Sequence, residues 1–291
     1  MNKVIALGTF DGVHRGHRQL IDQCVSLARS QGLRPLIYTF SNHPLEAFSS
    51  RPQLLMPNRI RIETLSSLCE TVTVPFDRTY ASMEPRDFAG MLQTEFSMQV
   101  AVAGFNYTFG DKGRGDMHCL KAFGEEMGFQ VLEIPPCLYA GAPISSTRIR
   151  AAVSTGQMEE ATAMLGRPYS MRGAVTPGRV IGHGLTLSTI NFYFAKEQVL
   201  PAAGVYATWI EIRGLGHKPA VTNIGWSESV DGASLRVEIY VPDLPEDPQG
   251  EKAEVIFIKH LRDDSAFPSG AALAAQIGED ARIVQGLLQD A

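Results

Sequence analysis

Short apolar runs alternate with amphipathic stretches along the first 140 residues. KVIALGTF (3–10) and RPLIYTF (34–40) have the continuous apolar character of buried strands, and RQLIDQCVSLARSQG (18–32) between them gathers its apolar residues on one helical face. A strand, a helix and a strand within about 40 residues form a βαβ unit, which requires parallel strands. The alternation continues with predicted helices at 59–69, 85–96 and 119–128 and predicted strands at 70–76, 99–105 and 130–136. The pattern predicts an α/β domain with a doubly wound parallel sheet.

A different pattern begins after residue 167. Two short helices, 146–155 and 157–166, precede the turn-like stretch GRPYS, and short strands separated by turn residues follow it. The predicted strands are 169–178, 204–214, 218–226, 235–244 and 252–261, and a terminal helix is predicted at 270–288. We therefore expect two domains, an α/β domain at 1–167 and an antiparallel β-barrel with a terminal helix at 168–291.

Composition narrows the classes of partner. The 291 residues are 44% hydrophobic and 20% charged, with a net charge of −5. The chain therefore has no broad basic field, and we do not expect it to bind nucleic acid. No apolar run approaches the roughly 18 residues of a membrane span, and Val4–Leu7 is too short for a signal peptide. The four cysteines match no zinc or redox spacing, and Cys24 lies on an apolar helical face, which fits a buried thiol in a cytoplasmic protein. The sequence gives no indication of oligomeric state.

The loop GTFDGVHRGH (8–17) joins the first predicted strand to the first predicted helix. Ligands of open α/β sheets bind at the carboxyl ends of the strands, and a helix N-terminus attracts phosphate. Gly8 and Gly12 allow the backbone to turn, and Gly16 allows a ligand to approach the first helical turn.

Two histidines in this loop are candidates for phosphate contacts. His14 and His17 are three positions apart, so on a starting helix they point the same way and can donate hydrogen bonds to phosphate oxygens. Two alternatives remain open. The histidines can be ordinary surface or N-cap residues, or part of a zinc site, for which the sequence offers no third and fourth ligand at a sensible spacing.

A second segment, ISSTRIR (144–150), also indicates an anion site. Ser145, Ser146 and Thr147 are residue types that cap helices, and they precede Arg148 and Arg150. Arginine early in a helix opposes the helix dipole, so the pair indicates an anion in front of this helix. Alternatively, Arg150 pairs with a surface carboxylate.

Together these segments resemble a known family. GTFDGVHRGH carries the HxGH signature of the adenylyl- and cytidylyltransferase superfamily, and with ISSTRIR and the β-rich tail the chain resembles the bacterial riboflavin kinase/FMN adenylyltransferase (FAD synthetase) family. The resemblance covers nearly all 291 residues and is strongest up to about residue 168. It implies a nucleotidyltransferase-like N-terminal domain that transfers AMP from ATP to FMN, giving FAD and pyrophosphate.

The resemblance also implies roles for individual residues. His14, His17 and Arg148 would be catalytic and would hold the triphosphate together with Ser146 and Thr147. The other implied ATP-binding residues are Gly8, Phe10, Asp11, Gly16 and Ser145, and the implied flavin-binding residues are His43 and Pro44 in TFSNHP and Asn106, Phe109 and Gly110 in GFNYTFGDKGRGD. Positioning and charge stabilisation suffice for this transfer, and Mg²⁺ would be held mainly by phosphate oxygens and water.

The barrel departs from the family pattern. Its hallmark Gly-Phe-Pro-Thr-Ala-Asn is TLSTIN here (186–191), in which Thr189 and Asn191 would bind Mg²⁺ and ATP phosphate. Glu238 matches the base that acts on the riboflavin hydroxyl. The replaced positions are Thr186, Leu187, Ser188 and Ile190, and further changes are WSESV after NIG (223–225) and DPQG at 247–250.

These departures leave the riboflavin kinase reaction open. Either the kinase is lost, or Thr189, Asn191 and Glu238 suffice; Ile190 is expected to be bulky beside the phosphates. Two other functions also stay open for the whole chain: a nucleotidyltransferase for another phosphate acceptor, such as an altered flavin, and a non-catalytic flavin or nucleotide sensor. The presence of His14, His17 and Arg148 argues against a sensor.

Overall fold

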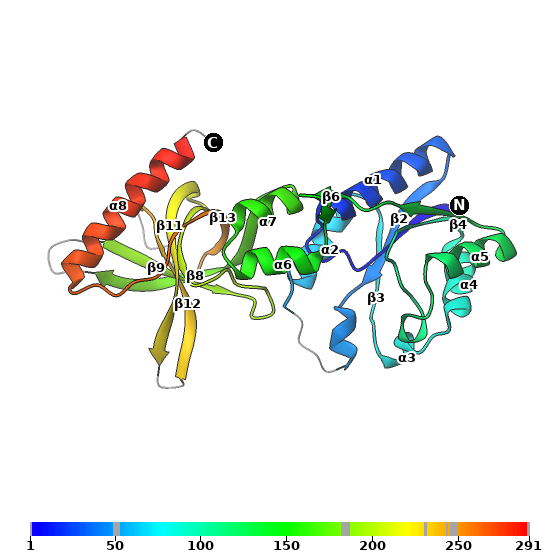
Figure 1. Cartoon of the computed structure of the whole chain (residues 1–291), viewed down its shortest axis with the longest axis horizontal. Helices are drawn as coiled ribbons and strands as arrows, with labels where there is room; N and C mark the ends of the chain where they lie inside the picture. Colours follow the sequence, from blue (N-terminus) through cyan, green and yellow to red (C-terminus); the bar gives the residue numbers. More distant parts are fainter. Residues whose placement is uncertain are drawn as a thin grey trace. The chain divides into compact units, whose positions relative to one another are not determined.

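Two compact units, Met1–Ser146 and Thr147–Ala291, make up the computed structural model of the chain (Figure 1). The structure describes residues 2–48, 53–181, 187–229, 232–242, 244 and 250–289, with the backbone alone at 177–181, 187–188, 227–229 and 232–234. Within these residues no helix is long and apolar enough to cross a membrane. The domain boundary between 167 and 168 stays a prediction.

The first unit contains a five-stranded parallel sheet in the order β3-β2-β1-β4-β5, as the βαβ pattern predicts. Its strands are β1 (Lys3–Leu7), β2 (Arg34–Phe40), β3 (Thr71–Val74), β4 (Met98–Gly104) and β5 (Gln130–Ile134). The chain winds outward from β1 to β3 and then returns to β4 beside β1. The loops that follow β1 and β4 therefore diverge at a topological switch point, where ligands of such sheets bind.

Helices cover both faces of this sheet (Figure 1). They are α1 (Arg15–Ser30), α2 (Asn58–Ser66), α3 (Arg78–Ala81), α4 (Pro85–Phe96) and α5 (Met117–Met127), with the 3₁₀ turns η1 (Pro44–Phe48) and η2 (Asp111–Gly113) and the hairpin β6 (Leu138–Tyr139)–β7 (Ala142–Pro143). Alternate residues of β1 face opposite sides: Val4 packs with α1, whereas Ile5 packs with α4 and α5. Cys24 of α1 is buried against β1, as its place on the apolar face predicts.

The second unit contains a closed barrel in the order β10-β11-β12-β9-β8-β13. Its elements are α6 (Ser146–Ser154, which begins at the last residue of the first unit), α7 (Met158–Leu165), β8 (Tyr169–Ile181), β9 (Leu187–Phe194), β10 (Gly204–Ile212), β11 (Gly216–Ser229), β12 (Gly232–Tyr240), β13 (Lys252–Arg262) and α8 (Gly270–Gln289). α8 covers β10 and β11 through Ala281, Val284 and Leu288. β9 is missing from the strands that hydrophobic patterning predicts, because polar residues interrupt the apolar ones in its first half, LSTIN.

Candidate nucleotide and flavin sites

The loop after β1 has an unusual backbone. The backbone φ angles of Phe10, Gly12 and Val13 are +57°, +78° and +41°. Residues other than glycine rarely adopt this left-handed region. A Cβ on Gly8 would lie 2.9 Å from the Phe10 ring, and one on Gly16 would lie 3.3 Å from the His14 ring. These glycines therefore make room for neighbouring rings, and the approach of a ligand to Gly16 stays a prediction. Backbone strain of this kind gathers at functional sites.

His14 and His17 stack at the start of α1. Their ring centroids are 3.5 Å apart with an interplanar angle of 17°, so the two imidazoles do point the same way. His14 is the N-cap, and its Nδ1 accepts a hydrogen bond from the backbone N–H of His17 at 3.3 Å. Because Nδ1 accepts, neutral His14 carries its proton on Nε2 and presents a donor there.

His17 is held in its neutral form. Burial, followed by the nearby His14 and Arg61, lowers the pKa of His17 well below its ordinary value. The Phe10 ring meets it edge-on at 5.3 Å. The Nδ1 atom of His17 is buried without a hydrogen-bond partner among the described residues. Buried polar atoms are nearly always satisfied, so this nitrogen marks a place for a ligand atom or water.

A hydrogen bond from Ser146 connects the ISSTRIR segment with the loop after β1. The Ser146 hydroxyl donates a hydrogen bond to the backbone carbonyl of Asp11 at 3.0 Å, so α6 begins beside the loop. The buried carboxylate of Asp11 in turn accepts the N–H of Leu55 at 3.1 and 3.2 Å, which shapes the loop. Ser145 precedes this contact, and Thr147 and Arg148 follow it in the first turn of α6. The contacts of these three with nucleotide stay predictions.

The segment after β2 lies at the same edge of the sheet, because β1 and β2 are parallel. Asn42 fixes it by exchanging hydrogen bonds with the backbone of Phe76 at 2.8 and 2.9 Å. His43 is partly exposed, and its Nδ1 accepts the N–H of Leu45 at 3.2 Å. Pro44 begins η1. Both residues therefore lie near the carboxyl end of β2, as an active-cleft role requires.

The predicted flavin-binding residues in the loop after β4 lie in different environments. Asn106 is exposed, whereas the Phe109 ring is buried and packs on Phe88 of α4 at 5.4 Å. Gly110 has φ +72°, and a Cβ there would lie 2.6 Å from Pro85, so this position requires glycine. The loop is thereby held against the start of α4.

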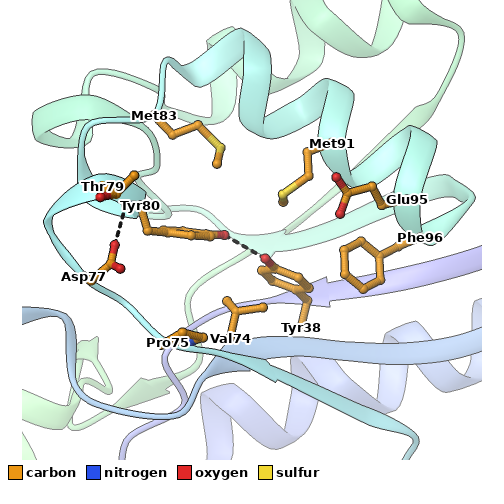
Figure 2. A pocket seen from close by; sticks show the side chains of 10 residues that line it. All are labelled: Tyr38, Val74, Pro75, Asp77, Thr79, Tyr80, Met83, Met91, Glu95 and Phe96. Atoms are coloured by element: carbon orange, nitrogen blue, oxygen red, sulfur yellow. Dashed lines mark hydrogen bonds between the residues drawn. The ribbon is translucent and has the colours of Figure 1, made fainter.

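A cavity of about 300 Å³ lies between the β2–β3 surface and the helices α3 and α4 (Figure 2). Figure 2 shows the Tyr38 and Tyr80 hydroxyls meeting inside it, 2.8 Å apart. The lining residues are Tyr38, Val74, Pro75, Asp77, Thr79, Tyr80, Met83, Met91, Glu95 and Phe96. Sequence reasoning missed this cavity, because its residues come from four separate elements.

The cavity adjoins the loop after β4. Phe88 contacts Tyr38 and Tyr80 on one side, at 6.2 and 6.3 Å, and Phe109 on the other. Met83 lines the cavity and accepts the backbone N–H of Asp111 at 2.7 Å. The cavity and the predicted flavin-side loop therefore share a wall.

In the barrel, three polar residues lie in one row across adjacent strands. Glu238 of β12 is the register partner of Asn191 of β9 and of Asn223 of β11. Partners directly opposite in antiparallel strands share a face of the sheet. The Oδ1 atom of Asn223 is buried without a hydrogen-bond partner in the described part of the chain. The structure thus brings together Asn191 and Glu238, to which the resemblance gives roles, and adds Asn223, the first residue of the family-like NIG segment, to which it gives none.

Thr189 and Ile190 occupy different environments beside this row. Thr189, two positions from Asn191 on the same strand face, is buried. Ile190 is 3% exposed and pairs with Ile239, so it belongs to the barrel core. Its side chain therefore lies on the other face of the strand from Asn191, the residue that the resemblance implies for phosphate. Thr186 and residues 247–249 lie outside the described residues, as do the side chains of Leu187 and Ser188.

Comparisons with known proteins cover both units. Residues 1–148 match the FAD synthetase family and residues 165–288 match the riboflavin kinase family. A bifunctional riboflavin kinase/FMN adenylyltransferase of Listeria monocytogenes is 32% identical over 286 residues, which cover 96% of this chain and 90% of the relative. Its counterpart in Escherichia coli K12 is 32% identical over 285 residues, covering 95% and 90%.

Solved structures agree on the architecture. A crystal structure described as a macrolide-efflux protein from Streptococcus pneumoniae superposes with a TM-score of 0.88 and 29% sequence identity. The match covers 98% of this chain and 94% of that protein. Its fold therefore includes both the parallel sheet and the barrel.

Proposed function

The chain belongs to the bifunctional riboflavin kinase/FMN adenylyltransferase family, and from this premise we propose how its residues carry out the two reactions. It is an FAD synthetase: AMP passes from ATP to FMN, and FAD and pyrophosphate are formed. A riboflavin kinase domain follows in the same chain. The roles of individual residues below are proposals.

In the first reaction an oxygen of the FMN phosphate attacks the α-phosphorus of ATP. The bond from that phosphorus to the bridging oxygen breaks, and pyrophosphate leaves with the electron pair. His14 donates from Nε2, and His17 meets the triphosphate as a neutral imidazole whose pKa rises when the anion arrives. The stacked pair at the N-terminus of α1, with its buried and unpartnered His17 nitrogen, is the observation that carries this assignment.

Magnesium fits both sites through oxygen atoms. No cluster of three histidine, cysteine, aspartate or glutamate side chains able to hold a metal occurs among the described residues, so in the first unit the ion would depend on phosphate oxygens and water. In the barrel, Thr189 and Asn191 would hold it, and the unpartnered Asn223 Oδ1 nearby suits a cation that prefers oxygen. When bound, Mg²⁺ neutralises phosphate charge.

The cavity between β2–β3 and α4 is our candidate for the flavin ring. Its volume of about 300 Å³ and its aromatic and methionine lining suit a flat, largely apolar ring system. Met91→Trp fills this space, so the KM for FMN should rise at least about tenfold with the KM for ATP unchanged. Met91→Leu, which nearly conserves volume, is the matched control. Equal KM values for FMN in both variants would place the ring elsewhere.

We also propose that the barrel still phosphorylates riboflavin. The alignment of Asn191, Glu238 and Asn223 supports this, and Ile190 does not enter their face. Glu238 would accept the proton of the riboflavin hydroxyl as its oxygen attacks the γ-phosphorus of ATP, and ADP would leave. The substrates are small molecules, and the free thiols of all four cysteines suit a cytoplasmic location.

One chromatographic assay tests both assignments. Purified protein receives ATP and Mg²⁺ with either FMN or riboflavin, and His17→Ala and Glu238→Gln are assayed beside it. We expect His17→Ala to lower FAD formation from FMN about 100-fold, with conversion of riboflavin to FMN intact. Glu238→Gln should lower the conversion of riboflavin to FMN and leave FAD formation from FMN intact. Unchanged FAD formation in His17→Ala would refute the site, and an inert wild type with riboflavin would mean that the kinase is lost.

If FMN fails as acceptor, other phosphate-bearing flavins in the same assay test the alternative acceptor. Binding of ATP and FMN without turnover would instead indicate a sensor.

A further inference from the structure

A buried arginine lies beneath the nucleotide loop. Arg61 of α2 is 1% exposed, which is rare for arginine. Its guanidinium donates to the carbonyl oxygen of Thr9 at 2.9 Å and to that of Phe40 at 2.6 Å. It also donates to Thr39 Oγ1 and to Asn58 Oδ1, both at 3.0 Å. One side chain thus joins the end of β1, the end of β2 and the start of α2.

All four acceptors are uncharged. No carboxylate lies within ion-pair distance of Arg61 in the part of the chain that the structure describes. Burial lowers the pKa of Arg61, and the more distant Asp11 and Glu46 offset this only in part. Burying a cation among neutral partners is costly, so its charge is better explained by an effect on its surroundings than by stability. Its positive charge also reaches the loop: after burial and the nearby His14, Arg61 contributes to the lowered pKa of His17.

The contact between Arg61 and the Thr9 carbonyl affects the position of the nucleotide loop. Thr9 directly precedes Phe10, whose left-handed backbone and ring shape the approach to His17. A second, weaker contact, from Thr39 Oγ1 to the Thr9 carbonyl at 3.4 Å, lies beside the first. Fixing the Thr9 carbonyl therefore fixes the point at which the chain leaves β1 for the histidine pair.

We propose that Arg61 is a positioning residue for adenylyl transfer: it holds the Thr9 and Phe40 carbonyls together and so sets the nucleotide loop, with His14 and His17, against the carboxyl ends of β1 and β2. It does so without touching substrate. This inference rests on the proposed role of the histidine pair.

Three variants test it. Arg61→Met removes the hydrogen bonds and the charge, Arg61→Lys keeps the charge but loses the planar fork, and Arg59→Met removes an exposed arginine of the same helix that pairs with Glu63. For each we would measure kcat and KM for FAD formation from FMN, the melting temperature, and the His17 pKa by NMR without ligand.

We expect kcat to fall about 100-fold in Arg61→Met and about tenfold in Arg61→Lys, because small displacements of catalytic groups have effects of this size. Burial is the main cause of the low His17 pKa and remains in every variant, so this pKa should rise only in part in Arg61→Met, which loses the positive charge, and stay unchanged in Arg61→Lys. Arg59→Met should match the wild type. These two readouts separate positioning from a merely structural role, which would change only the melting temperature.

A folded Arg61→Met with kcat within threefold of wild type would overturn the proposal. If Arg61→Met does not fold, a folded Arg61→Lys with kcat within threefold of wild type would overturn the proposal instead. If the wild type itself does not adenylylate FMN, the proposed function fails, and the inference about Arg61 is then decided by the His17 signal. An unchanged His17 pKa in Arg61→Met would refute it independently.

Discussion

The Ser146 hydroxyl donates a hydrogen bond to the Asp11 carbonyl across 135 positions of sequence. This bond joins the two segments whose composition separately indicates an anion site, GTFDGVHRGH and ISSTRIR. Asp11 also accepts the N–H of Leu55, so one residue links three parts of the first unit. The loop that carries the histidine pair is thus held from two sides.

Ser146→Ala should weaken adenylyl transfer through this link. Loss of one hydrogen bond should lower the free energy of unfolding by about 1 kcal/mol and raise the KM for ATP. Ser154→Ala, which removes the exposed bond from Ser154 to Ala151 in the same helix, is the matched control. Urea unfolding and steady-state kinetics measure both effects, and equal behaviour of the two variants would contradict the linking role.

Gly12→Ala should destabilise the protein more than Gly32→Ala. Both glycines have left-handed φ angles, +78° and +65°, so alanine costs about 1 kcal/mol at either position. At Gly12 the new Cβ would also lie 2.7 Å from Leu55 Cδ1, whereas at Gly32 nothing lies within 4 Å. We expect Gly12→Ala to cost about 3 kcal/mol in denaturant unfolding. Equal losses would show that Leu55 moves aside freely.

The lowered pKa of His17 predicts a pH dependence of stability. Below about pH 6.5 the unfolded chain protonates this histidine while the folded protein keeps it neutral, so the unfolded state binds more protons. Stability should therefore fall with decreasing pH from about 6.5 down to the folded-state pKa and be unaffected by His17 above it. Urea unfolding of the wild type and of His17→Gln between about pH 5 and 8, in steps of about half a pH unit, tests this prediction. Parallel pH curves for the two proteins would contradict it.

Asp280→Ala should destabilise the barrel and its terminal helix. Asp280 of α8 is 2% exposed and pairs with Arg262 of β13 at 2.8 Å. Removing the carboxylate leaves a largely buried guanidinium without its ion-pair partner, which should cost about 3 kcal/mol. Glu279→Ala, which breaks the exposed pair with Arg282, should cost less than about 1 kcal/mol. Thermal unfolding compares the two, and similar melting temperatures would refute the difference.

The sequence by itself determined most of the elements and the fold class of both units. The apolar face of 18–32 predicts α1, and the apolar runs at 3–10 and 34–40 predict parallel β1 and β2, which the structure confirms. Local patterning suffices here, because the side chains that a strand or helix buries repeat with its own period. Motif spacing also predicts that His14 and His17 point the same way, since both lie within one turn of chain.

Only the tertiary structure decided how these parts meet. The bond from Ser146 to Asp11, the carbonyls gathered by Arg61, the row of Asn191, Glu238 and Asn223, and the cavity at Tyr38 and Tyr80 all join residues from separate elements. Strand β9 was missed for a related reason: polar residues interrupt the apolar ones in its first half, LSTIN, and its place in the barrel is decided by pairing with β8 and β12. Local periodicity records which face of an element is buried, but the distances, charges and pKa values of a site depend on which faces pack together, and folding alone sets that.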